Sequence, residues 1–298
     1  MTAEKAPAVL TPTATTAAGA TLSRRTPRPQ RFLVTRPTYF DVVYSINPWM
    51  HTDVDTDAGL AMRQWENLVA TFRRLGHEVE ICEGAPGLPD MVFAANAGTV
   101  IDGVAVPAKF STDKRSGEEK PYTDWFRDHV GSVVVPTLVN EGEGDLLWTG
   151  RLLLAGSGFR TDPLAHNEVA EALGVPLVPL KLVDPSFYHL DTALAVLDTG
   201  SAGASGRAET IAYYPGAFSA GSQAALRRLY PDAIIASRAD AEWFALNAVS
   251  DGRNVVVPEQ APTFARQLEE RGFVPVPVDV SEFRKAGGGA KCCTLILR

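Results

Sequence analysis

The fold follows from one stretch, LAMRQWENLVATFRRLGHEVEI (residues 60–81). Its apolar side chains, among them Trp65, Leu68 and Phe72, recur at the spacing of one helical face. Gly76 would end this helix as a C-terminal cap, and the HEVEI that follows alternates polar and apolar residues as a strand does. The stretch therefore predicts a helix, a tight turn and a strand.

The same unit recurs four more times along the chain. The later copies are YTDWFRDHVGSVVVP (122–136), HNEVAEALGVPLVPL (166–180), SQAALRRLYPDAIIA (222–236) and TFARQLEERGFVPVPV (263–278). Their turns follow one another at intervals of 41 to 57 residues. Periods of this length are typical of repeat architectures, in which each unit needs its neighbours to bury its apolar face.

Hairpins are expected after four of the five predicted strands. Their turns lie at Asp102-Gly103, Thr149-Gly150, Asp251-Gly252 and in a Gly/Ser-rich segment at 199–208. The fifth unit lacks a return strand, so CCTLILR (292–298) is expected to pair with RFLVTRP (31–37). The sequence therefore predicts one propeller-like α/β ring of five units closed by its two ends. The alternative is a plain doubly wound α/β domain, which would not require these regular hairpins.

Composition limits the classes of protein to which the chain can belong. Its 298 residues carry a formal charge of −7, which argues against nucleic acid as the main partner. The three cysteines exclude a disulfide framework and suit a reducing cytosol, so a cytoplasmic location is expected. No apolar run is long enough for a membrane span. Residues 1–29 are expected to be a disordered extension, and 30–298 a single catalytic domain.

Each unit carries unusual polar residues between its strand and its hairpin. These residues are Asn96, the pair Glu143 and Asp145, the pair His189 and Asp191, Asn247, and Cys292. If the units are related by a pseudo-rotation, these positions meet at one end of the axis. A thiol beside an imidazole suits nucleophilic catalysis, and the surplus carboxylates suit a planar guanidinium cation. The substrate is therefore expected to be a guanidino compound.

Each of these residues also has a simpler interpretation when it is taken alone. His189 could be a histidine at a strand edge, and Glu143 and Asp145 could be turn residues between glycines. Cys292 could be a packed core residue. His189 and Asp191 would supply two metal ligands, but no Cys/His spacing completes a zinc site, so no metal is expected. The matching positions within the repeat favour a shared functional site.

At these residues the sequence resembles the pentein superfamily of guanidino-group-modifying enzymes, over roughly residues 31–298. The motifs that carry the resemblance are PDMVFAANAG (89–98), NEGEGD (140–145), FYHLDTAL (187–194) and GGGAKCCTL (287–295). The superfamily includes arginine deiminases, dimethylargininases and amidinotransferases. The resemblance implies a five-bladed α/β propeller with pseudo-five-fold symmetry.

The resemblance also implies a role for each catalytic residue. Cys292 would be the nucleophile, His189 the general acid and base, and Glu143 the carboxylate partner of His189. Asp191 would bind the guanidinium, and Asp145 would be a further acidic residue of the pocket. Cys292 would attack the guanidinium carbon to form a thiouronium intermediate, which water activated by His189 would hydrolyse. No cofactor is implied by this chemistry.

Four further residues complete the expected substrate site. Arg115 and Arg160 are candidates for binding the α-carboxylate of the substrate. Where deiminases have an Asp that holds the guanidinium, this chain has Asn96. Together with SINPWM around Asn47, this difference is most similar to the arginine dihydrolases, which convert arginine to ornithine, carbon dioxide and two ammonia. We hypothesise that Asn96 retains a ureido-like product for a second hydrolysis.

Several alternatives to an arginine dihydrolase stay open at this stage. A dimethylargininase or an arginine deiminase would give citrulline, and an amidinotransferase would pass the amidino group to an amine. A non-catalytic binding protein of the same fold would not need Cys292, His189 and Glu143 together. The expected partner is a small molecule, arginine or a methylated arginine, and assembly into a homo-oligomer is left open.

Overall fold

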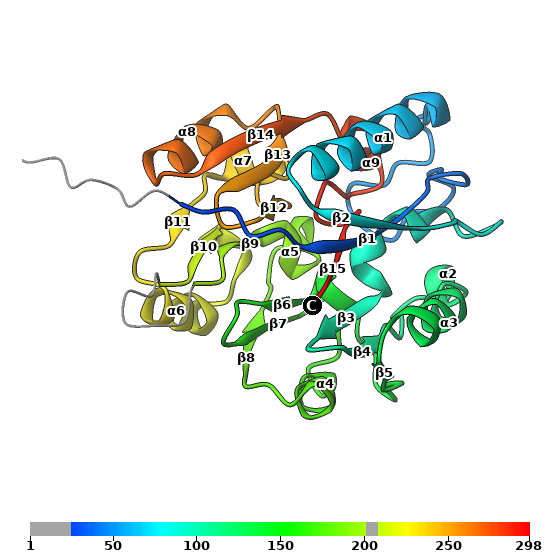
Figure 1. The fold of residues 1–298 in the computed structure, drawn as a ribbon, viewed down its shortest axis with the longest axis horizontal. Helices are drawn as coiled ribbons and strands as arrows, with labels where there is room; N and C mark the ends of the chain where they lie inside the picture. The colour runs from blue at the N-terminus through cyan, green and yellow to red at the C-terminus, as the bar shows by residue number, and fades with distance from the viewer. Residues whose placement is uncertain (1–24, 201–207) are drawn as a thin grey trace, which may run out of the picture.

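The computed structural model describes residues 25–200 and 208–298, which form an α/β fold. Helices longer than eight residues are α1 (Ala58–Arg74), α3 (Glu119–His129), α4 (Ala165–Leu173), α6 (Ala220–Leu229) and α8 (Pro262–Glu270). Shorter helices are α2 (Asp113–Ser116), α5 (Leu190–Ala193), α7 (Arg238–Glu242) and α9 (Ser281–Lys285). The five longer helices lie around the outside of the strands (Figure 1).

The strands of the described residues repeat one three-stranded motif, in which an antiparallel pair is extended by a parallel strand. Four copies are β3 (Gly98–Ile101), β4 (Val104–Pro107) and β5 (Ser132–Val133); β6 (Leu146–Trp148), β7 (Leu153–Ser157) and β8 (Leu177–Lys181); β9 (Leu194–Asp198), β10 (Thr210–Tyr213) and β11 (Ile234–Ile235); and β12 (Val249–Ser250), β13 (Asn254–Pro258) and β14 (Val274–Val278). Each copy has the order hairpin, helix, parallel strand that the repeat predicts.

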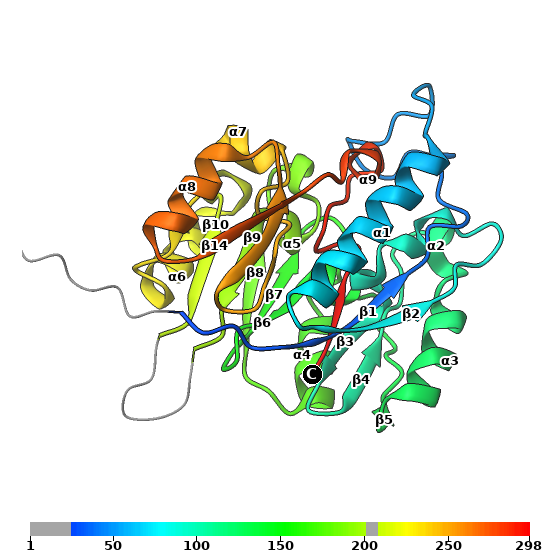
Figure 2. The same ribbon diagram turned by 45° about the horizontal axis from the view of Figure 1, so that its top comes forward.

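The fifth copy joins the two ends of the chain. β1 (Arg31–Thr35) pairs antiparallel with β15 (Leu295–Leu297) and parallel with β2 (Glu78–Cys82), as Figure 2 shows. The predicted pairing of the C-terminal strand with the first strand is thereby confirmed, with Phe32 opposite Ile296.

The strands of residues 25–200 and 208–298 are divided among four sheets. One has six strands in the order β2-β1-β15-β3-β4-β5, because a single bridge between Leu297 and Val100 joins two of the copies. The other three sheets have three strands each. The α/β class is confirmed, and closure of the copies into a five-bladed ring stays a prediction.

Helix α1 shows how the repeated unit forms. Asp57 caps its first turn by accepting a hydrogen bond from the Leu60 N–H at 2.8 Å. Trp65, Leu68 and Phe72 are buried on the predicted face, and burying each contributes about 2 kcal/mol. Gly76 then takes a positive φ of 91°, which favours glycine and turns the chain into β2. Helix, turn and strand are as predicted.

The N-terminal boundary differs from the prediction. Arg25 forms an ion pair with Asp198 and stacks over Phe273, and the Arg28 N–H donates to the Asp251 carbonyl at 2.9 Å. These contacts hold residues 25–29 against the domain, so the predicted disorder is wrong for these five residues. Residues 1–24, and most of the predicted 199–208 loop, lie outside the described residues.

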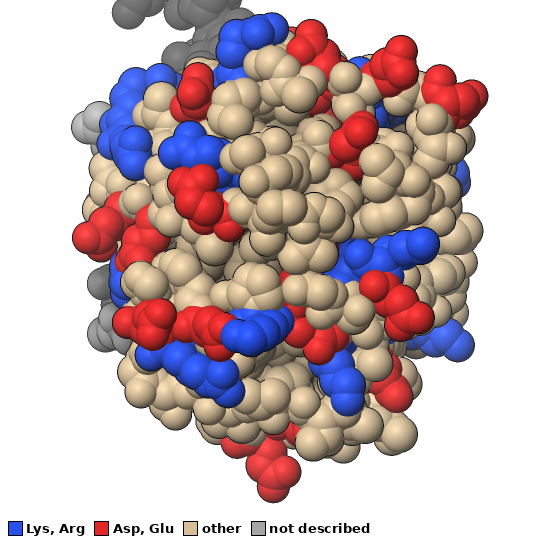
Figure 3. Space-filling view, turned by 90° about the vertical axis from the view of Figure 1, so that its right-hand side faces the viewer, with Lys and Arg blue, Asp and Glu red and all other residues tan. Residues whose placement is uncertain are grey.

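The surface carries charges of both signs. On the face in Figure 3, Lys and Arg side chains are interspersed with Asp and Glu. Exposed pairs such as Lys120 with Asp124 contribute little to stability, because water screens them. In the described part of the chain, no helix has the length and apolar character needed to cross a bilayer.

Candidate active site

The polar residues singled out by the repeat lie just before the first strand of each motif. Asn96 precedes β3, Asp191 precedes β9, Asn247 precedes β12 and Cys292 precedes β15. All four are buried. Hydrogen bonds across motifs join three of them, Asp191, Asn247 and Cys292, so the structure brings these three together.

Cys292 lies between an amide and a carboxylate. Its Sγ is 3.0 Å from the Asn247 Nδ2 and 3.3 Å from the Asp191 Oδ2. Its backbone N–H donates to the Asn247 Oδ1 at 2.9 Å. Burial, and then the negative charge of Asp191, raise the pKa of the Cys292 thiol well above its usual value. In the free protein the sulfur is therefore a neutral thiol, which donates to Asp191.

His189 is oriented by Glu141. The His189 Nε2 lies 2.7 Å from the Glu141 Oε2, which also accepts from the Arg160 Nη1 at 2.9 Å. Burial alone would raise the pKa of Glu141, but Arg160 and then His189 outweigh it and hold the pKa well below its usual value. An ionised Glu141 can only accept a hydrogen bond, so Nε2 carries a hydrogen and Nδ1 is left for proton transfer.

The assignment of Glu143 as the partner of His189 is therefore corrected to Glu141. Glu143 instead accepts from the Lys291 Nζ at 3.0 Å, from the Ile296 N–H at 3.0 Å and from Arg298. The physical reason is the turn at 142–144, where Gly142 takes a positive φ of 56° and directs neighbouring glutamates to different partners. Glu143 thus anchors the C-terminal strand.

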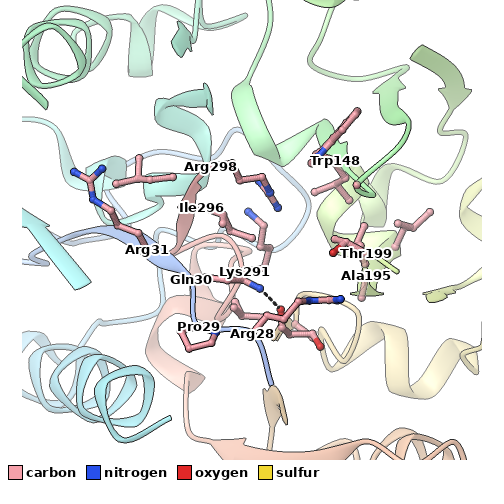
Figure 4. Close-up of a pocket in the computed structure, with 18 residues that line it drawn as sticks. Arg28, Pro29, Gln30, Arg31, Trp148, Ala195, Thr199, Lys291, Ile296 and Arg298 are labelled. Carbon is pink, nitrogen blue, oxygen red and sulfur yellow. Dashed lines mark hydrogen bonds between the residues drawn. The ribbon is translucent and has the colours of Figure 1, made fainter. Parts of the chain in front are cut away.

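Lys291 and Arg298 also line a cavity of about 370 Å³. Figure 4 shows their side chains next to each other at this cavity, with Arg28 and Arg31 on other parts of its wall. Cys292 is not among the residues that line it. Lys291 is adjacent to Cys292 in sequence, but its ammonium group is directed to Glu143 and the Thr294 carbonyl.

Two buried polar atoms of the candidate site, one on Asp191 and one on His189, have no hydrogen-bond partner among the described residues. They are the Asp191 Oδ1 and the His189 Nδ1. Burial raises the pKa of Asp191 to about 6 because it disfavours the ionised carboxylate. A cation bound beside Asp191 would favour the ionised form again. An unpaired carboxylate oxygen and an unpaired imidazole nitrogen in a buried site are costly unless a ligand uses them. These two atoms belong to the residues that the sequence predicts to bind the guanidinium and to transfer protons.

Asn96 and Arg115 form a buried network beside this group. The Asn96 Oδ1 accepts from the Arg115 Nη1 at 2.8 Å, and the Asn96 Nδ2 donates to the Glu141 carbonyl at 3.0 Å. Arg115 also makes a two-pronged contact with Glu118, both distances being 2.8 Å. The Asn96 side chain can approach the backbone at Gly144 this closely only because glycine has no Cβ. A Cβ at this position would lie 2.3 Å from the Asn96 Nδ2.

The remaining predicted residues hold protein groups in place. The carboxylate of Asp145 accepts from Thr161 Oγ1 at 2.7 Å and from the Leu190 N–H at 3.0 Å, directly after His189. Asn47 accepts from the Trp49 N–H at 2.9 Å and donates to the Ala286 carbonyl at 3.1 Å. Both residues therefore support the walls of the site, whatever contact they make with a substrate.

Sequence reasoning missed two residues of this site, Glu141 and Asp90. Glu141 lies within the quoted motif NEGEGD, and nothing in the sequence separates it from Glu143. Asp90 is buried; its Oδ2 accepts from the Tyr44 hydroxyl at 2.9 Å, while its Oδ1 has no partner among the described residues. A buried aspartate at the start of PDMVFAAN was the available signal. In the described residues, no His, Cys, Asp and Glu side chains form a group of three that could hold a metal ion.

Comparison with known proteins gives relatives over most of the chain. An N(G),N(G)-dimethylarginine dimethylaminohydrolase of Mycobacterium tuberculosis is 52% identical over 273 residues, which cover 92% of this chain and 87% of that protein. The bifunctional arginine dihydrolase/ornithine cyclodeaminase ArgZ of Synechocystis is 37% identical over 89% of this chain. The match spans only 37% of the length of ArgZ. No protein-family model matches the chain.

Among solved structures, a mutant of the ArgZ N-terminal domain bound to its substrate superimposes with a TM-score of 0.84. It is 36% identical, and the match covers 90% of this chain and 98% of that domain. The part of ArgZ that resembles this chain is therefore its N-terminal, arginine dihydrolase domain.

Proposed function

Since the chain belongs to the pentein-type guanidino hydrolases, we propose that it hydrolyses the guanidino group of arginine or of a methylated arginine. The observation that carries this proposal is the buried group of Cys292, His189 and Asp191. It combines a thiol with a carboxylate oxygen and an imidazole nitrogen that lack partners among the described residues. Such a group matches a planar cation: the carboxylate can bind it, the thiol can attack it, and the imidazole can protonate the amine that departs.

We infer further that the five three-stranded motifs close into a five-bladed α/β propeller with pseudo-five-fold symmetry. The recurrence of the same antiparallel and parallel pairing supports a ring. The polar residues before the first strands would then meet at one end of its axis.

The reaction begins when a guanidinium replaces the thiol proton as the partner of Asp191. The cation next to the sulfur lowers the pKa of the Cys292 thiol, which burial and Asp191 had raised, and the thiol proton passes to His189 Nδ1. The thiolate attacks the guanidinium carbon and gives a tetrahedral adduct. His189 donates a proton from Nδ1 to the departing amine, and a thiouronium intermediate is left on Cys292.

Hydrolysis then uses the same residues in reverse. His189 takes a proton from a water molecule, the water attacks the thiouronium carbon, and the C–S bond breaks to release Cys292 as a thiolate. Glu141 fixes the orientation of the imidazole throughout, because it holds Nε2–H. Every step uses only groups of the protein, the guanidino substrate and water.

The two ends of an amino-acid substrate can be bound by groups already described. The Asp90 Oδ1, which lacks a partner among the described residues, suits an α-ammonium group. Arg115 and Arg160 are the candidates for the α-carboxylate. Arg160 already donates to Glu141 and to the Ile46 carbonyl, so it can link the carboxylate site to the catalytic pair.

We favour an arginine dihydrolase, and Asn96 is the reason. Its Oδ1 is used by Arg115, whereas one of the two hydrogens on Nδ2 is left beyond the bond to the Glu141 carbonyl. That hydrogen can bind the oxygen of a ureido product and retain it for a second attack by Cys292. An aspartate at this position would offer only acceptors and would release the ureido compound.

A dimethylargininase is the second candidate, favoured by the 52% identity to the Mycobacterium tuberculosis protein of that name. The two activities differ in the amine that leaves in the first step. Arginine gives ammonia, and asymmetric dimethylarginine gives dimethylamine. The thiouronium left on Cys292 is the same in both cases.

The test is a product assay with arginine, asymmetric dimethylarginine and agmatine. Two ammonia per ornithine, without citrulline, are expected from arginine. Citrulline with dimethylamine from dimethylarginine would instead establish the dimethylargininase, and citrulline from arginine a deiminase. Agmatine lacks the α-carboxylate and should be hydrolysed poorly. If none of the compounds is hydrolysed by the wild type, the proposed function is wrong; Cys292→Ser is the blank.

A further inference from the structure

Asn247 makes a two-point contact with the candidate nucleophile. Its Nδ2 lies 3.0 Å from the Cys292 Sγ, and its Oδ1 accepts from the Cys292 backbone N–H at 2.9 Å. One amide group thus fixes both the sulfur and the backbone of the same residue. This arrangement sets the direction of the sulfur relative to Asp191. The distance from the Cys292 Sγ to the Asp191 Oδ2 is 3.3 Å.

Asn247 is itself held firmly by its surroundings. It is fully buried, and its Nδ2 also donates to the Asp191 carbonyl at 3.2 Å. Its backbone N–H donates to the Phe244 carbonyl at 2.9 Å, and Phe244 has a φ of 59°, which is unusual for an aromatic residue. Such a conformation persists only where the surrounding fold enforces it.

The loop that carries Cys292 is shaped to receive this amide. A Cβ at Gly289 would lie 2.8 Å from the Asn247 Oδ1, so only glycine lets the two segments approach this closely. The Lys291 backbone N–H donates to the Asn247 carbonyl at 3.2 Å. The residue therefore contacts the nucleophile loop through its side chain and its backbone.

In the part of the chain that the structure describes, the charged and titratable groups around the sulfur do not supply a cation in direct contact with it. Asp191 raises the pKa of the thiol, and the neighbouring Cys293 acts in the same direction. Tyr188 is a further titratable group close enough to interact with Cys292. His189 donates to Glu141, and the ammonium of Lys291 contacts Glu143 and the Thr294 carbonyl.

We propose that Asn247 is the hydrogen-bond donor that stabilises the Cys292 thiolate, both when it forms for attack and when it leaves at the end of the reaction. A neutral donor suits this task, because a lysine or arginine at this place would repel the guanidinium that the site must bind. The inference rests on the proposed role of Cys292 as nucleophile. It assigns a catalytic part to a residue outside the Cys292, His189 and Glu141 set.

The two chemical steps explain why the donor acts twice. In the first step the thiolate lone pair forms the C–S bond and the amine departs with a proton from His189. In the second, water adds, and the C–S bond breaks with its electron pair returning to sulfur. The sulfur is negative before the first step and after the second, so a donor on Sγ favours both the attack and the release.

The test is the pH dependence of Cys292 alkylation by iodoacetamide, followed by peptide mass spectrometry so that Cys82 and Cys293 are counted separately. Asn247→Leu keeps the shape of the side chain but removes the donor. The midpoint of the profile is expected to rise by about one pH unit or more, because a hydrogen bond to a charged group is lost. Below the midpoint, alkylation then slows about tenfold. An unchanged midpoint with a lower plateau would show a purely structural role and overturn the proposal.

Asn247→Asp covers the case in which the leucine variant does not fold. It keeps the acceptor for the Cys292 N–H, loses the donor to sulfur and adds a negative charge. Asn96→Asp is the matched control, since it adds the same charge to the site without touching the sulfur. The proposal requires a larger rise of the midpoint in Asn247→Asp than in Asn96→Asp; equal rises would refute it.

Kinetics with whichever substrate the wild type hydrolyses give a second readout. A lost thiolate donor should lower kcat and leave KM within about threefold, because the bond acts on the sulfur during the chemical steps. A rise in KM alone would mean that Asn247 serves binding, against the proposal. Alkylation needs no substrate, so a failure of the proposed function and a failure of this inference are distinguishable.

Discussion

Glu141 and Glu143 are two residues apart, both fully or almost fully buried, and they belong to different regions of the molecule. Glu141 faces the His189 and Arg160 side chains of the candidate active site. Glu143 faces Lys291 and Arg298, at the C-terminal strand and the cavity behind it. In both cases positive partners outweigh burial and lower the pKa of the carboxyl group.

The difference lies in what each carboxylate holds. Glu141 holds an imidazole whose Nδ1 has no partner among the described residues, so in the proposed mechanism its charge serves proton transfer. Glu143 holds two cations and a backbone N–H of β15, so its charge serves the closure of the chain ends. Burial and a lowered pKa alone therefore do not identify a catalytic carboxylate; the partner does.

The largest effect on activity is expected from Glu141→Gln. The amide keeps the shape but removes the charge that holds His189 Nε2–H, so the wrong imidazole nitrogen can carry the hydrogen. We expect kcat to fall by about 100-fold or more, as for other general acids and bases that lose their orienting partner. Glu143→Gln, assayed on its folded fraction, should lose less than about tenfold. Equal losses would erase the distinction between the two regions.

Glu143→Leu should have the largest effect on stability. It leaves Lys291 buried without its carboxylate, and breaking a buried pair costs about 3–5 kcal/mol. Urea unfolding at neutral pH measures this loss. Because the pKa of Glu143 is lowered in the folded state, its stabilising contribution is present above the usual glutamate pKa and is lost as pH falls toward the folded value. The difference between wild type and variant should therefore shrink in acid; a constant difference would point to packing alone.

The pKa of Asp191 is shifted in the opposite direction to that of Glu143, so its ionisation destabilises the fold. Its pKa is raised from 3.8 to about 6 by burial, so ionising it in the folded protein costs about 3 kcal/mol. This cost is absent at a pH below the pKa of the aspartate in the unfolded chain. It is complete at a pH above the pKa of Asp191 in the folded protein. Asp191→Asn should therefore be about as stable as the wild type in acid and more stable above pH 6, while losing activity. Urea unfolding on both sides of this range tests it, and a variant less stable at neutral pH would contradict the sign.

The smallest effect is expected from Arg298→Gln. Arg298 is one of two cations on Glu143, and it is partly exposed whereas Lys291 is buried. Loss of this contact should cost about 1 kcal/mol, because Lys291 and the Ile296 N–H continue to hold the carboxylate. Thermal unfolding measures the change, with Lys120→Gln as a surface control. A loss as large as that of Glu143→Leu would mean that Arg298, not Lys291, holds the region together.

Periodicity in the sequence predicted the repeated unit well. The helix and strand of each copy and the pairing of β1 with β15 follow from local signals, namely apolar spacing, glycine turns and hairpin dipeptides. The positions of Asn96, Asp191, Asn247 and Cys292 followed from the same repeat. The attachment of residues 25–29 to the rest of the domain depends on long-range contacts, such as the ion pair of Arg25 with Asp198, which no local pattern encodes.

The choice between Glu141 and Glu143 could not be made from the sequence. Both lie in one glycine-rich motif, and their directions are set by the positive φ of Gly142 and by partners more than 40 residues away. Asp90 was missed for a similar reason, because an unpartnered oxygen is a property of the packed site. Local signals place residues before a strand, and only the tertiary contacts decide which of them meets His189.

The central claim is that Cys292 carries the covalent intermediate of guanidino hydrolysis. The most direct measurement is mass spectrometry of the peptide that contains Cys292, after the enzyme is mixed with arginine and quenched rapidly in acid. The account predicts that Cys292 gains the mass of arginine less one ammonia, and that this species disappears as product forms. Product formed with no adduct on Cys292, or with the adduct on another residue, would contradict it.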